Sequence, residues 1–169
     1  MEGGKGFIKE YNYDGELEFE GEYLNGERNG KGKEYNENGK LEFEGEYIKG
    51  KRWNGKVKEY YDNGKLKFKG KHLNEERNGK GKEYNSNGKL IYEGEYLNGK
   101  RWNGKGKEYD YKGELKFEGE YLNGKIWNGK VKEYYDNGKL RFEGEYLNGK
   151  KNGIFFEEFL NEKRDNDSK

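Results

Sequence analysis

Almost the whole chain is built from one repeated segment of 24 or 25 residues. Six aromatic residues open the pattern aromatic-[EK]-G-[EK]-[YH]-[LI], and successive ones are separated by 24, 25, 24, 25 and 25 residues. A repeat of roughly 20 to 50 residues is typical of architectures in which one unit cannot bury an apolar face alone and shares it with its neighbours. The repeat therefore predicts an elongated array. The six aromatic positions are Phe19, Phe43, Phe68, Tyr92, Phe117 and Phe142.

Each unit contains two segments with the alternation of a β-strand. From Leu41 to Ile48, aliphatic, aromatic or glycine residues alternate with glutamates, which gives one apolar face. After a turn, the segment KVKEYY at residues 56–61 forms the second strand. Asn-Gly dipeptides, which favour type I′ hairpin turns, occur fourteen times, and the chain has no proline. We therefore predict an all-β fold, an elongated single-layer antiparallel meander of about thirteen short strands.

The second strand has one irregular feature. Val57 and Tyr60 are three residues apart, so both cannot point to the same face of a regular strand, and Val131 and Tyr134 repeat the conflict. Either this strand contains a bulge or both of its faces are partly covered. The repeats predict a single domain over residues 1–160, followed by a polar tail at 161–169.

The composition limits both fold and location. Only 28% of the residues are hydrophobic and 41% are charged, so a thick core is not expected. Disordered chains are usually poor in aromatic residues and carry a large net charge, whereas this chain has 17% aromatic residues and a net charge of +1. The small net charge also argues against nucleic-acid binding, which rewards a basic excess. With neither a long apolar run nor a signal peptide, we expect a soluble, cytoplasmic protein.

Few residues could support catalysis. The chain has one histidine, His72, two serines, and neither cysteine nor threonine, so most nucleophile and base arrangements cannot be assembled. The segment G-x-x-x-x-G-K occurs three times, but it lacks the following Ser or Thr and lies in a hairpin rather than before a helix. His72 has no second ligand of its kind for a metal. We predict that the protein is not an enzyme and has no catalytic residues, no metal site and no cofactor.

The spacing of aromatic residues and glycines resembles the MORN (membrane occupation and recognition nexus) repeat, roughly Y-x-G-x-[WFY]-x-x-G-x-x-x-G-x-G-x-[YF]. The YYDNGKL segment is more similar to the bacterial variant of the repeat, some of whose members are called antitoxin-like. The resemblance covers about 150 residues. It implies a twisted single-layer sheet of hairpins with a shallow groove. In the first unit the matching residues are Phe19, Gly21, Tyr23, Gly26, Gly30, Gly32 and Tyr35.

A single-layer sheet is not expected to hide all of its aromatic residues, and an exposed apolar strip usually marks an interaction site. We therefore predict a non-enzymatic protein-interaction or scaffold module that binds a protein segment, or a second copy in a homodimer, through an aromatic groove. The alternative is a membrane-surface adaptor that binds anionic phospholipid headgroups through lysine rows, although interleaved glutamates would weaken that field. The predicted groove residues are Phe43, Tyr47, Phe68, Phe117, Tyr121, Phe142 and Tyr146.

Two further groups of residues are candidates for partner binding. Trp53, Trp102 and Trp127 are the extra residues of the 25-residue units, placed here in loops. They either cap the aromatic row or anchor a partner, because Trp is favoured where one side is apolar and the other wet. The third unit reads FKGKHLNEERNG where its neighbours read FEGEYLNGK. We predict a basic spot for an acidic partner segment at Lys69, Lys71 and His72.

Overall fold

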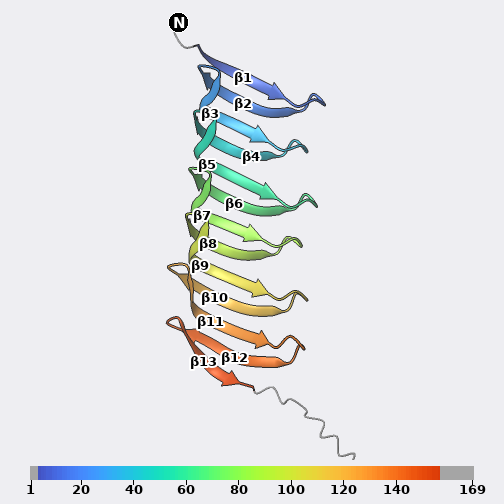
Figure 1. Ribbon diagram of the computed structural model, residues 1–169, viewed down its shortest axis with the longest axis vertical. Coiled ribbons are helices and arrows are strands. Elements are labelled where there is room, and N and C mark those ends of the chain that lie inside the picture. Colours follow the sequence, from blue (N-terminus) through green and yellow to red (C-terminus); the bar gives the residue numbers. More distant parts are fainter. Residues whose placement is uncertain (1–3, 157–169) are drawn as a thin grey trace, which may run out of the picture.

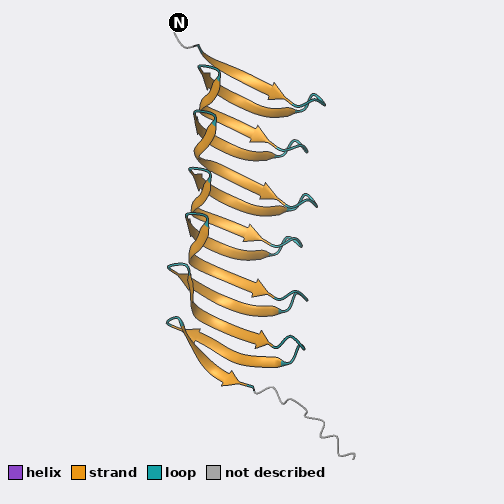
Figure 2. Cartoon of the chain, viewed as in Figure 1, coloured by secondary structure: helices purple, strands orange, loops and turns teal. Residues whose placement is uncertain are grey.

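The computed structural model describes residues 4–156, which form one open sheet of thirteen β-strands (Figure 1). Each strand pairs antiparallel with its neighbours in the sequence, and no helix occurs among these residues (Figure 2). The predicted all-β meander is confirmed, while the predicted tail at 161–169 lies outside the described residues. The strands are β1 (Lys5–Tyr11), β2 (Leu17–Leu24), β3 (Glu27–Tyr35), β4 (Leu41–Ile48), β5 (Lys51–Tyr60), β6 (Leu66–Leu73), β7 (Glu76–Tyr84), β8 (Leu90–Leu97), β9 (Lys100–Tyr109), β10 (Leu115–Leu122), β11 (Lys125–Tyr134), β12 (Leu140–Leu147) and β13 (Lys150–Phe155).

The turns along the two long edges of the sheet differ in kind. Between β2 and β3, Asn25 and Gly26 both have positive φ, 55° and 83°, as a type I′ turn requires. At the opposite edge, between β3 and β4, only Gly39 has positive φ, and the Asn36 side chain accepts hydrogen bonds from the amides of Asn38 and Lys40. The type I′ prediction therefore holds for one edge of the sheet only. The remaining Asn-Gly dipeptides, such as the one at residues 54–55, lie inside strands.

One face of the sheet, called here the aromatic face, holds the core. The Phe43 ring lies against the backbone, because a Cβ atom added to Gly45 or Gly55 would come within 2.8 or 2.6 Å of it. The rings meet edge to face, with centroids 5.1 Å apart for Phe19 and Tyr47. A single layer thus buries its aromatic residues against its own glycines. The buried residues are Phe19, Phe43, Tyr47, Val57, Phe68, Tyr92, Tyr96, Phe117, Tyr121, Val131 and Phe142.

The second strand has no bulge between Val57 and Tyr60. The register between β5 and β6 shifts at Glu59 and Tyr60 because the extra residue, Lys67, lies on β6. From Val57 to Tyr60 strand β5 alternates regularly, so Val57 is buried on the aromatic face and Tyr60 is half-buried on the opposite face. The second alternative therefore holds, because both faces of this strand are partly covered. The structure also corrects the predicted bounds, because β5 begins at Lys51 rather than residue 56.

The hairpins with type I′ turns occur in two registers. In the 24-residue unit of β2 and β3, Gly21 pairs with Gly32. In the 25-residue unit of β4 and β5, Gly45 pairs with Gly55, which is the equivalent of Gly30 when the Asn-Gly dipeptides are aligned. The registers of these two hairpins therefore differ by two residues, and the hairpin of β12 and β13, which has no tryptophan, pairs Gly144 with Gly153 in the same way as β4 and β5. The side chains keep their faces, but a different glycine lies under the ring.

Candidate functional site

The other face of the sheet, called here the polar face, consists mainly of lysine and glutamate rows. Lysines of odd-numbered strands lie opposite glutamates of even-numbered strands, and their ion pairs are 2.7 to 3.9 Å long. Such exposed pairs each stabilise a protein by about 0 to 1 kcal/mol, but they neutralise the rows. The pairs are Lys9–Glu20, Lys33–Glu44, Lys82–Glu93, Lys107–Glu118 and Lys132–Glu143.

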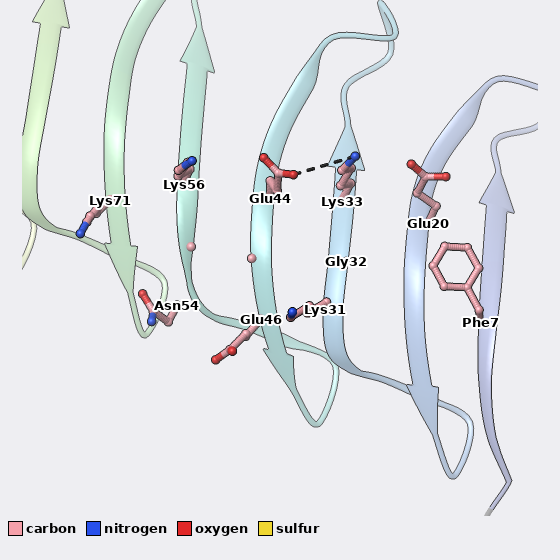
Figure 3. Close-up of a pocket in the computed structure, with 12 residues that line it drawn as sticks. Phe7, Glu20, Lys31, Gly32, Lys33, Glu44, Glu46, Asn54, Lys56 and Lys71 are labelled. Carbon is pink, nitrogen blue, oxygen red and sulfur yellow. Dashed lines mark ion pairs between the residues drawn. The ribbon is translucent and has the colours of Figure 1, made fainter.

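The polar face is hollowed along the sheet. One hollow of about 580 Å³ lies over β1 to β6, and Figure 3 shows its Lys and Glu side chains on either side of a glycine backbone. A second hollow of about 780 Å³ over β4 to β8 shares Glu44, Lys56 and Lys71 with the first. A third of about 410 Å³ shares Glu93 with the second and reaches β10. Together they form one continuous depression, called here the polar groove.

The structure places the seven predicted groove residues in the core instead. Six are buried and the seventh, Tyr146, is half-buried against them. The expectation of an exposed aromatic strip is therefore wrong, because rings of adjacent repeats cover one another and arginines cover the rings. The Arg28 guanidinium, for example, lies 4.1 Å from the centre of Phe19. The buried residues of this group are Phe43, Tyr47, Phe68, Phe117, Tyr121 and Phe142.

A polar network on the aromatic face was missed by the sequence reasoning. Glu34 accepts hydrogen bonds from Arg52 Nε at 2.9 Å and from the Tyr47 hydroxyl at 2.8 Å. Burial raises the pKa of Tyr47, and burial would also raise the pKa of Glu34, but these two hydrogen bonds hold it below its ordinary value. Arg77 and Arg101 repeat the arrangement with glutamates 18 residues earlier. The sequence does contain a signal for this network, because each arginine follows its glutamate by 18 residues.

The three tryptophans lie within β5, β9 and β11, not in loops as predicted. A Cβ atom added to Gly124 would lie 3.5 Å from the Trp102 ring, so this ring packs on the type I′ turn of the next hairpin. Trp127 packs on Gly149 in the same way. Trp53, whose next turn carries Glu75 instead of glycine, is 42% exposed. Trp102 and Trp127 therefore each cover a turn of the following hairpin.

The structure separates the three residues predicted to form one basic spot. Lys69 and Lys71 are exposed on the polar face and line the polar groove. His72 lies on the aromatic face, where it occupies the place of a tyrosine, with Nε2 3.7 Å from Glu59 Oε1. Burial would raise the pKa of Glu59, but its contacts with His72 and Arg77 lower it to about 2. The predicted basic spot is therefore reduced to Lys69 and Lys71, because His72 lies on the other face of the sheet.

Residues 4–156 offer neither a group of three or more His, Cys, Asp or Glu residues placed to hold a metal nor a helix that could span a membrane. A family model described as MORN repeat variant matches residues 28–49, 53–74, 77–98 and 127–148, more than half of the chain. The model of the MORN repeat matches residues 92–114. No curated protein matches the sequence.

The matched segments of the variant coincide with pairs of strands, β3 with β4, β5 with β6, β7 with β8, and β11 with β12. MORN repeats are generally linked to interactions with proteins or membrane lipids. The periodic sequence, the open sheet of hairpins and these matches agree, and the chain belongs to the MORN repeat family.

Proposed function

We propose that the chain is a non-enzymatic scaffold that binds an extended protein segment in the polar groove. The observation that supports this function is the continuity of the hollows, which extend over β1 to β10. A groove with a floor of backbone and walls of charged side chains suits a narrow chain that lies along the long axis of the sheet. Such an occupant would contact several repeats at once, as in other repeat proteins with extended binding surfaces.

The walls of the groove carry both charges. Lysines and glutamates alternate from strand to strand, so a bound segment would be selected by the order of its own charges. The row of half-exposed aliphatic side chains at the ends of the even-numbered strands lies beside the type I′ turns and offers apolar contact at one margin. These residues are Leu24, Ile48, Leu73, Leu97, Leu122 and Leu147.

A selection of binders from a random peptide library tests this function. Peptides enriched on the wild-type chain would be measured against the variant Lys33→Trp with Glu44→Trp, which removes both members of an ion pair and fills the first hollow. The control is Glu37→Trp with Ser86→Trp, two exposed turn residues. We expect at least tenfold weaker binding to the filled groove and unchanged binding to the control. Equal affinity for both variants, or no enrichment, would contradict the proposal.

The membrane-surface alternative has less support from the polar face. Five of its lysines are paired with glutamates, which reduces the field that anionic headgroups would meet. Flotation with anionic vesicles at low and high salt separates the two functions, because headgroup binding through lysines must weaken with salt. Light scattering of the purified chain would show whether a second copy is the occupant, since a homodimer doubles the solution mass.

A further inference from the structure

The alternation of charge on the polar face is broken at one place. In the other even-numbered strands from β2 to β12, two glutamates occupy the positions of Lys69 and Lys71 in β6. With the lysines of β5 and β7, these two residues form a patch of six, called here the lysine cluster. Its members are Lys56, Lys58, Lys69, Lys71, Lys80 and Lys82.

Within the cluster, lysines lie directly opposite lysines. Lys71 pairs with Lys56, and Lys69 pairs with both Lys58 and Lys82. Like charges in opposed positions destabilise a sheet, whereas the other repeats place glutamate opposite lysine. Among residues 4–156, Lys82 is the one member with an ion pair, to Glu93. The cluster therefore holds several charges that carboxylates of a partner could neutralise.

All six lysines line the same hollow of about 780 Å³. Its walls continue into glutamates on both sides, with Glu44 on β4 and Glu93 and Glu95 on β8. Along the groove the charge therefore runs negative, positive over three strands, and negative again. Strands in a sheet are about 4.8 Å apart, so the positive stretch spans roughly 14 Å, the length of about four extended residues.

We infer that the lysine cluster binds an acidic run of about four residues, flanked by basic or neutral residues, in the protein segment that occupies the polar groove. This inference rests on the proposed function and adds the chemistry of the partner. In the complex, carboxylates of the acidic run form ion pairs with the lysines that lie opposite one another in the free chain. The glutamates on β4 and β8 set the ends of the run, because further acidic residues would meet like charge.

The geometry favours a protein segment over other polyanions. A flat anionic membrane surface would meet the glutamates of β4 and β8 together with the lysines, and repulsion would offset the attraction. A single-stranded nucleic acid is held by stacking of its bases on aromatic rings, and the lining of this hollow contains no aromatic residue. A narrow acidic peptide can place its charges on the cluster alone.

Calorimetric titration of the full chain tests the inference. The probe is a synthetic peptide with a run of about four glutamates between Gly-Ser ends, and its counterpart carries glutamines instead. The variant Lys69→Glu with Lys71→Glu restores the residues of the other repeats and should weaken binding of the glutamate peptide at least tenfold. A variant with the same change of net charge elsewhere, Lys125→Glu with Lys150→Glu, should keep the wild-type affinity within about twofold.

The repeats also allow a second cluster to be built. The variant Glu118→Lys with Glu120→Lys places lysines on β10 between those of β9 and β11, with residue 118 opposite Lys107 and Lys130 and residue 120 opposite Lys105. We expect its stoichiometry for the glutamate peptide to rise from one to two. Circular dichroism of each variant would establish that the sheet is folded.

Failure of this inference can be distinguished from failure of the proposed function. Equal binding of the glutamate and glutamine peptides, or unchanged affinity of the Lys69→Glu, Lys71→Glu variant, would overturn the acidic-partner inference while library peptides could still bind the groove. Absence of glutamate-peptide binding would overturn it as well. Stronger attachment to phosphatidylserine vesicles than to the peptide, abolished by the same variant, would replace the protein partner with a lipid one.

Discussion

Gly45 lies between the Phe43 ring and the backbone of β5, where no side chain has room. A Cβ atom at this position would lie 2.3 Å from the Asn54 carbonyl oxygen and 2.5 Å from the Gly55 Cα atom. The ring in turn is fully buried. At the residue scale, the glycines are therefore what allows a single layer of strands to bury aromatic side chains.

The substitution Gly45→Ala should destabilise the sheet by about 3 kcal/mol, because the methyl group must displace paired backbone and a packed ring. Gly6→Ala is the matched control, since nothing lies within 4 Å of a Cβ atom there, and it should change stability by less than about 0.5 kcal/mol. Chemical denaturation monitored by circular dichroism measures both. A loss for Gly45→Ala no larger than that of the control would refute the packing argument.

Glu59 makes stability depend on pH. Its pKa of about 2 in the folded chain lies below the ordinary value of 4.5, so the ionised form contributes stability above about pH 4.5, and this contribution is lost as the pH falls toward 2. We expect Glu59→Gln to flatten this part of the curve of unfolding free energy against pH. Urea titrations at several pH values measure the slope, with the exposed turn substitution Glu37→Gln as the control. An unchanged slope would show that Glu59 is not the titrating group.

At the scale of the strand and hairpin, the register of the pairing decides which glycine lies under the ring. In the 24-residue hairpin, a Cβ atom on Gly32 would lie 2.6 Å from the Phe19 ring. In the 25-residue hairpin, Gly55 takes that position under Phe43, and the equivalent of Gly32 is Val57, which packs beside the ring. Where the glycine of the Asn-Gly dipeptide lies under the ring, a bulkier residue fits two positions later, as with Val57 here and Phe155 opposite Phe142 in β13.

Deletion of Trp53 should remove the extra residue of β5 and give this hairpin the register of β12 and β13, which has neither a tryptophan nor a bulge. Gly55 then stays opposite Gly45 and Val57 stays beside the Phe43 ring, so we expect a loss of less than about 1.5 kcal/mol that adding Val57→Gly does not recover. Deletion of Trp102, whose strand has Gly106 at the position of Val57, should cost a similar amount. Thermal unfolding of the three variants measures the differences. A clearly larger loss for the Trp53 deletion, recovered by Val57→Gly, would show that the hairpin takes the register of β2 and β3 instead.

The even-numbered strands were predicted in full, because LEFEGEYI alternates without interruption from Leu41 to Ile48. The start of β5 was missed because the bulge at Trp53 breaks the alternation, which made Arg52 and Trp53 read as a loop. The burial of Tyr47 could not be read from its own repeat either. Its cover comes from Phe19 and Arg28 of the preceding repeat, and such contacts depend on how neighbouring strands stack.

At the scale of the whole molecule, the two faces of one sheet have different roles. The aromatic face packs glycines, rings and the arginine–glutamate pairs into a thin core, and little of it is left for a partner. The polar face contributes only weak ion pairs to stability, yet it holds the continuous groove. Lys69 and Lys71 were recognised in the sequence as a break in the repeat, but only the structure shows that they lie opposite three further lysines and share a hollow with a fourth, Lys80.

Amide chemical-shift mapping tests the central claim most directly, because it shows which face of the sheet a partner contacts. The isotope-labelled full chain would be titrated with the glutamate peptide. The account predicts shifts concentrated on β5, β6 and β7, at the lysines of the polar face, with smaller shifts toward β4 and β8. Shifts concentrated at the edge strands β1 and β13, or among the buried aromatic residues, would show that the polar groove is not the binding surface.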